Sequence, residues 1–149
     1  MENKIFEPHK SSIGNLDANV VALIAYLGGA ILGFIPGIRY VAFLVPIIIY
    51  VIEKDSKFVK FHAMQSILLS AVGVVLSIIL AIIISIATAA IIHSGGYGAL
   101  GALTVLSLLI WIIAIVLLVF FIIAAVKSYK YEIYKMPLIG NWAEKIALK

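Results

Sequence analysis

The longest apolar stretch of the chain runs from Phe61 to Val126, where 66 consecutive residues include no Lys, Arg, Asp or Glu. The hydrocarbon core of a bilayer is about 30 Å thick, and a helix needs about 20 apolar residues to cross it. The stretch is therefore long enough for two crossings. A single cluster of helix breakers, at residues 93–98, interrupts it. The pattern predicts a transmembrane hairpin with helices over residues 64–92 and 99–126.

Two shorter apolar segments precede this hairpin. Residues 18–38 are uncharged and long enough for a span, and Pro36-Gly37 marks the end of that span. Residues 40–52 are also apolar, but a helix of 13 residues measures only about 20 Å. The sequence leaves two all-α architectures open, each with short interfacial helices. One is an integral membrane four-helix bundle, and the other has three spans plus a re-entrant segment at 40–52.

The lysines orient these segments. Residues 53–60 and the tail after Val126 are rich in lysine, whereas residues 93–98 carry no formal charge. Cytoplasmic loops carry an excess of Lys and Arg, so we expect the lysine-rich segments inside and the turn outside. The four-helix arrangement gives a cytosolic tail (1–17), a membrane domain (18–126) and a cytosolic interfacial tail (127–149). Such a chain would be a multi-pass inner (plasma) membrane protein with both termini cytoplasmic.

Composition agrees with a membrane protein. The chain is 64% hydrophobic and 12% charged, whereas soluble domains are about 45–50% apolar and about 25% charged. Its formal net charge is +4. Because the basic residues adjoin apolar segments, we expect them to meet anionic head groups of the bilayer, and we expect no nucleic-acid partner. The sequence contains no cysteine, which excludes thiolate metal sites and cysteine nucleophiles.

A stripe of small residues follows one face of the helix predicted over 64–92. Small residues let helix backbones approach closely in lipid, so we expect the stripe to pack against another helix of the chain. Two alternatives stay open. The serines could line a polar path, or the stripe could be the contact face of a dimer. The stripe consists of Ser66, Ser70, Gly73, Ser77, Ala81 and Ser85.

Two stretches rich in aromatic and polar residues, 58–66 and 129–146, flank the hairpin on its predicted cytosolic face. Asn141 and Glu144 resemble a capping box, which predicts a short helix from Trp142. Both stretches fit a lipid anchor, and they also fit a docking surface in which Glu144 lies near His62 or Lys60. The candidate docking residues are Lys60, His62, Gln65, Asn141, Trp142 and Glu144.

The stretch 58–66, the long apolar hairpin, the run Pro137-Leu138-Ile139-Gly140 and the run Ala143-Glu144-Lys145 together resemble a known family. It consists of small prokaryotic membrane proteins related to the twenty-kilodalton subunit of the chloroplast inner-envelope import translocon. The resemblance extends over the chain from about Val20. It implies a helical membrane domain and, through the plastid members, a link to protein translocation. It implies no catalytic residues.

Convergent polar groups, which catalysis needs, are not apparent. His62 and His93 are predicted on opposite sides of the membrane, and no metal-binding or nucleotide-binding motif occurs. We therefore expect a non-enzymatic protein without a cofactor. It would be a scaffold or accessory subunit of a membrane complex, bound to a protein partner or to a second copy. The alternative is a transport or protein-translocation element that forms a polar path as an oligomer.

Overall fold

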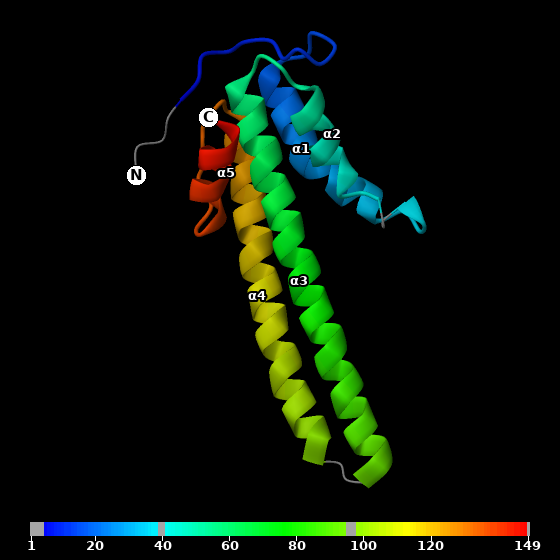
Figure 1. Cartoon of the computed structure of the whole chain (residues 1–149). Coiled ribbons are helices and arrows are strands. Elements are labelled where there is room, and N and C mark those ends of the chain that lie inside the picture. Colours follow the sequence, from blue (N-terminus) through cyan, green and yellow to red (C-terminus); the bar gives the residue numbers. More distant parts are fainter. Residues whose placement is uncertain (1–4, 39–40, 95–97, 149) are drawn as a thin grey trace. The chain divides into compact units, whose positions relative to one another are not determined.

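The computed structural model describes residues 5–38, 41–94 and 98–148, and within these ranges the chain forms helices and no strands (Figure 1). This confirms the all-α fold class for the part of the chain described. The described residues form five helices: α1 (Ala18–Gly33), α2 (Leu44–Ile52), α3 (Lys57–Ser94), α4 (Gly98–Tyr129) and α5 (Ile139–Ala147).

The two long apolar helices expected from the sequence are α3 and α4, with 38 and 32 residues. Both are long and apolar enough to cross a membrane. α3 begins earlier than the predicted residue 64, because the hydroxyl of Ser56 accepts a hydrogen bond from the Val59 N–H (3.1 Å) and caps the helix there. α4 continues past Val126 to Tyr129. Residues 95–97 of the predicted turn lie outside the described residues.

The helices α1 and α2 are shorter than the spans predicted over 18–38 and 40–52. With 16 and 9 residues, they measure about 24 Å and about 14 Å. α1 ends at Gly33 because Pro36 has no N–H to continue the helix and Gly37 adopts a φ of 86°. The two helices pack closely, since a Cβ placed on Gly29 would lie 3.1 Å from the Ala42 carbonyl oxygen. Neither helix alone has the length expected of a span.

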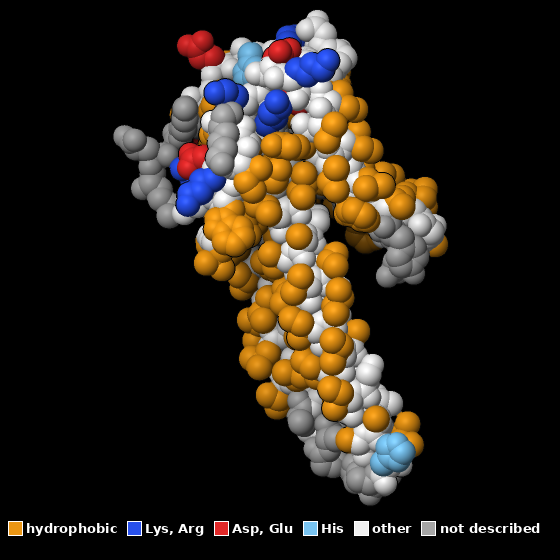
Figure 2. All heavy atoms as spheres, in the orientation of Figure 1, with side chains coloured by type: hydrophobic (Ala, Val, Ile, Leu, Met, Phe, Trp, Pro, Cys, Tyr) orange, Lys and Arg blue, Asp and Glu red, His pale blue; other side chains and the backbone are white. Residues whose placement is uncertain are grey.

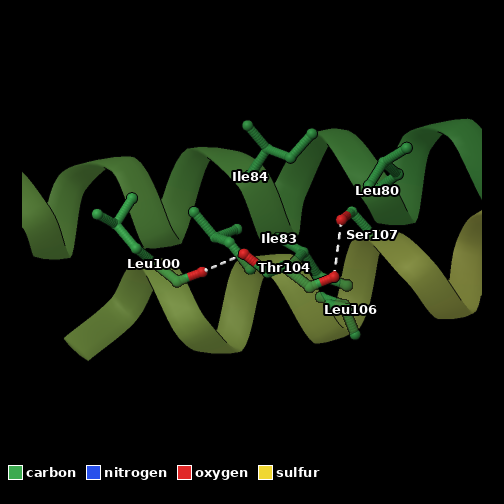
Figure 3. A pocket seen from close by; sticks show the side chains of 8 residues that line it. Leu80, Ile83, Ile84, Leu100, Thr104, Leu106 and Ser107 are labelled. Carbon is green, nitrogen blue, oxygen red and sulfur yellow. Dashed lines mark hydrogen bonds between the residues drawn. The ribbon is translucent and has the colours of Figure 1, made fainter. Parts of the chain in front are cut away.

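The chain divides into two compact units, and the helices α3 and α4 run through both. Unit 1 comprises Met1–Ser70 and Phe120–Lys149, and unit 2 comprises Ala71–Val119. In unit 2, α3 and α4 form a groove whose walls include Leu80 and Ile83 (Figure 3). The hydroxyls in this groove donate hydrogen bonds to backbone carbonyls of their own helix, α4. Thr104 donates to the Leu100 carbonyl (2.9 Å), and Ser107 donates to the Thr104 carbonyl (2.8 Å).

The core of unit 1 joins the beginning of α3 to α1 and α5. Phe58, Val59 and Phe61 are fully buried against apolar residues of α1, and against Ala143 and Ala147 of α5. The tail after α4 is therefore part of the folded core.

The start of α5 differs from the prediction. The helix begins at Ile139 instead of Trp142, and Asn141 lies inside it and is not its cap. The reason is a close backbone contact that the sequence pattern does not reveal. A Cβ placed on Gly140 would lie 2.6 Å from the Lys135 Cα, so only glycine lets the first turn of α5 pack here. Leu138, the residue before the helix, adopts a φ of 69°.

Candidate functional site

The charged residues of unit 1 gather at one end, at the beginning of α3 and the end of α4 (Figure 2). We call this part the polar head; it comprises residues 5–17, 53–66 and 128–148. Residues 5–17, the described part of the predicted cytosolic tail (1–17), pack here. The Phe6 N–H donates to the Tyr131 carbonyl (2.9 Å), and Ser11 is buried.

A buried carboxylate, Glu53, ties this N-terminal segment to the loop before α3. Its Oε2 accepts a hydrogen bond from the Ser11 hydroxyl. Its Oε1 accepts from the Ser12 hydroxyl (2.8 Å), the Ser12 N–H (3.2 Å), the Asp55 N–H (3.1 Å) and the Ser56 N–H (2.9 Å). Burial alone would raise the pKa of Glu53, but these hydrogen bonds outweigh it and lower the pKa to about 2. The carboxylate is therefore a structural anion.

His9 extends this Glu53 cluster. Its Nε2 lies 2.8 Å from the Ser56 hydroxyl, and its Nδ1 lies 2.8 Å from the Glu7 carbonyl. A carbonyl oxygen only accepts, so the Nδ1 carries a proton. The ring also packs against those of Phe58 and Tyr131, with centroids 6.2 and 5.9 Å away. The N-terminal segment is thus held by polar and by aromatic contacts.

A second buried network connects α1, α3 and the segment before α5. The Gln65 Nε2 donates to the Tyr26 hydroxyl (3.1 Å) and to the Tyr134 carbonyl (3.0 Å), and the Gln65 Oε1 accepts from the Met136 N–H (3.2 Å). The Tyr26 hydroxyl lies 3.1 Å from the His62 Nδ1. This hydroxyl accepts from Gln65 and has one proton of its own to donate; when it donates that proton to Nδ1, the imidazole proton is on Nε2. The backbone of Glu132 also interacts with this imidazole.

This network changes the interpretation of two predicted docking residues. His62 and Gln65 are fully buried, so a partner on the surface would not touch them in this structure. They hold the polar head together instead. Tyr26, which sequence reasoning missed, is equally central. The sequence indicates its role only by placing a tyrosine in a largely apolar segment, because a buried tyrosine hydroxyl needs a hydrogen-bond partner.

The other predicted docking residues are more accessible. Lys60 is half-buried, whereas Asn141 and Trp142 are exposed. Glu144 pairs with Lys135 at 2.7 Å, in place of the expected His62 or Lys60. The pairing follows from the earlier start of α5, which packs its first turn on Lys135.

One face of α5 carries an apolar ridge of Trp142 and Ile146, four positions apart, which are 65% and 46% exposed. Leu138, just before the helix, is also exposed, at 89%. The opposite face, with Gly140, Ala143 and Ala147, is buried.

The small-residue stripe packs only where α3 lies in unit 1. Ser66 is buried and donates to the Ala25 carbonyl (2.8 Å). In unit 2, Gly73, Ser77, Ala81 and Ser85 are exposed. The expected close contact inside the chain is therefore not seen for these four described residues. The half-buried face of α3 there is a neighbouring row, mostly of larger residues, namely Val72, Leu76, Leu80, Ile83 and Ala87.

Candidate metal ligands do not converge in the part of the chain described, where no three His, Asp or Glu side chains are placed to hold an ion.

Comparisons with known proteins give a family and a relative. The sequence model of the magnetosome magnetite crystal formation protein family matches residues 17–143. A UPF0132 membrane protein of Methanocaldococcus jannaschii is 36% identical over 136 residues, which cover 91% of this chain and 93% of that protein. No solved structure matches.

These matches overturn the resemblance to the chloroplast translocon subunit, because neither leads to that family. The assignment rested on two short motifs beside a long apolar hairpin. Apolar hairpins of this composition suit any helical membrane protein, so they discriminate poorly between families.

Proposed function

The chain belongs to the magnetosome magnetite crystal formation protein family, and we propose that it is a non-enzymatic accessory protein of a membrane complex. The observation that carries this proposal is the contrast within unit 1. The buried polar side chains Glu53, Gln65, Ser66 and Ser128 find their hydrogen-bond partners within unit 1. By contrast, α5 turns Asn141, Trp142 and Lys145 outward. Such an arrangement suits a membrane protein that presents a surface to a partner, either another protein or a second copy.

We propose that α3 and α4 cross the membrane and that the polar head lies on the cytoplasmic face, as the positive-inside rule indicates. Glu53 joins the residues before α1 to the loop after α2, so this pair begins and ends at the same surface. This shared surface supports the four-helix arrangement, in which residues 18–38 and 40–52 both cross, over a topology in which residues 18–38 cross alone. Because α1 and α2 are short, the pair would either span a locally thinned bilayer or dip into one leaflet and return.

Thiol labelling tests this arrangement in the inner membrane, since the native chain has no cysteine. Single cysteines at Glu7, Ile38 and Gly96 would be treated in intact cells with an impermeant reagent. We expect labelling at Gly96 and none at Glu7. Labelling at Ile38 would indicate four spans, and protection would indicate a pair that dips and returns. Labelling at Glu7 would contradict the proposed orientation.

The apolar ridge of α5 supports an interfacial position for this helix, because Trp favours the boundary between lipid and water. Asn141 and Lys145, beside the ridge, would then face the cytoplasm and be available to a partner. The anchor and the docking surface would be two sides of one helix.

The partner-binding role is tested by purification in mild detergent followed by quantitative mass spectrometry. The variant Asn141→Ala/Lys145→Ala alters the exposed polar edge of α5, and Lys54→Ala removes an exposed lysine elsewhere in the head. We expect proteins or second copies enriched with wild type and Lys54→Ala to be lost from the α5 variant, at an unchanged melting temperature. Identical sets for all three would contradict the role.

The second candidate, a transport element with a polar path formed by an oligomer, draws on the exposed serines of α3. Its support is weaker, because the hydroxyls of Ser77 and Ser85 donate to carbonyls of their own helix at 2.8 Å and so need no water. Rapid reaction of Ser77→Cys and Ser85→Cys with a hydrophilic thiol reagent would favour this candidate. Protection of both would exclude it.

A further inference from the structure

An apolar groove between α1 and α4 in unit 1 has a lysine at one end. Its volume is about 340 Å³, within the range of about 300–1,000 Å³ that is common for ligand pockets. The residues that line it are Leu23, Leu27, Phe121, Ile122, Ala125, Val126, Tyr129 and Lys130.

The groove has the form of a channel for a chain-like ligand. Ala125 is buried and supplies a small residue at its floor, while Ile122 and Val126 are about half exposed. From Phe121 to Lys130 it follows α4 for about 14 Å, at 1.5 Å per residue. Near the lysine end, the Asn19 side chain of α1 donates to the Tyr129 carbonyl (2.9 Å) and fixes the two helices together.

Lys130 differs from its neighbours in having no carboxylate partner among the described residues. Lys127 pairs with Glu132 at 2.5 Å, and Lys135 pairs with Glu144 at 2.7 Å. Lys130 is exposed, and it lies just beyond the last apolar turns of α4. An unneutralised cation at the end of an apolar groove is complementary to an anion attached to a hydrocarbon chain.

We infer that this groove binds one anionic phospholipid of the surrounding bilayer. An acyl chain lies against Leu23, Leu27 and Ala125, and the phosphate meets the Lys130 ammonium. Tyr129 is at the level where tyrosines contact head groups. A second apolar helix would fill the same groove, but it would offer no anion and would desolvate the lysine charge at a cost. The inference rests on the proposed membrane position of α4 and not on the partner-binding role.

Native mass spectrometry of the full chain in mild detergent tests the inference. Phosphatidylglycerol and phosphatidylcholine would be added separately, and inorganic phosphate would be added as a competitor. We expect wild type to retain phosphatidylglycerol at least several-fold more than phosphatidylcholine, and free phosphate not to displace it. Lys130→Gln should abolish this preference, whereas Lys54→Gln, the matched change at an exposed lysine outside the groove, should keep it.

A second variant tests the apolar part of the site. Ala125→Leu should fill the floor and lower the retention of both lipids. Equal retention of the two lipids by wild type, an unchanged preference in Lys130→Gln, or a second copy in place of lipid would each overturn the inference. The cysteine-labelling result separates this failure from a wrong membrane orientation.

Discussion

Replacing Glu53 by Gln should loosen the polar head at the attachment of its N-terminal segment. The carboxylate accepts hydrogen bonds from the side chain or backbone of Ser11, Ser12, Asp55 and Ser56. An amide has one acceptor oxygen in place of two, and its NH₂ group would face donors. Hydrogen bonds to charged groups contribute about 1.5–3 kcal/mol each, and they are not additive.

The pKa of Glu53 gives an independent magnitude. The hydrogen bonds lower it from 4.5 to about 2 in spite of burial, and each unit corresponds to about 1.4 kcal/mol. The depressed pKa thus represents about 3 kcal/mol of stability. Because the folded-state pKa is the lower one, this contribution is complete above pH 4.5 and is lost as the pH falls from 4.5 towards 2.

Chemical unfolding in mild detergent, followed by the fluorescence of the two tryptophans, measures both effects. We expect Glu53→Gln to lower the free energy of unfolding at pH 7 by about 2–4 kcal/mol. We also expect it to remove the loss of stability that Glu53 should cause in wild type as the pH falls from 4.5 towards 2. Limited proteolysis should cut the variant faster after Lys10, which lies in the freed segment.

Glu7→Gln is the matched control, since Glu7 is an exposed carboxylate of the same segment. It should leave the free energy of unfolding within about 0.5 kcal/mol of wild type. The reasoning would be refuted if Glu53→Gln were equally neutral, or if its stability fell with acid as steeply as that of wild type.

Two further changes probe the packing of unit 1. Gly140→Ala should lower the free energy of unfolding by about 1–3 kcal/mol, because its Cβ would meet the backbone of Lys135, whereas Gly73→Ala should be nearly neutral, because nothing lies within 4 Å of a Cβ there. Equal melting temperatures for the two glycine variants would contradict the close contact. Tyr26→Phe should cost about 1–3 kcal/mol in the same measurement, since the His62 Nδ1 and one Gln65 N–H would lose their partner. An unchanged stability would show that the buried network contributes little.

The sequence predicted the long helices well because their signal is local and repeated. An uncharged run from Phe61 to Val126 needs no knowledge of tertiary contacts to be recognised as membrane helix. The boundaries were less accurate. The start of α3 depends on Ser56, and the start of α5 depends on the contact between Gly140 and Lys135.

The polar head could be located but not assembled from the sequence. Tyr26 is 36 residues from His62, and Gln65 is 69 residues from Tyr134. No spacing rule connects such pairs, so His62 and Gln65 were expected on a docking surface and lie buried. The small-residue stripe did not identify the covered face of α3, for a related reason. Small residues on one helix face permit close packing, but only the position of α4 decides which face of α3 is covered.

The contacts of the N-terminal segment set the order in which the chain can fold. Ile5 forms a bridge with Glu132, and the Phe6 N–H bonds to the Tyr131 carbonyl. These partners leave the ribosome after both long helices, and at about 5–20 residues per second that takes roughly 10 s. Residues 5 and 6 are therefore synthesised before both long helices but reach their partners only after them. A chain truncated within α4 would keep that segment exposed, which would mark the incomplete protein for proteolysis.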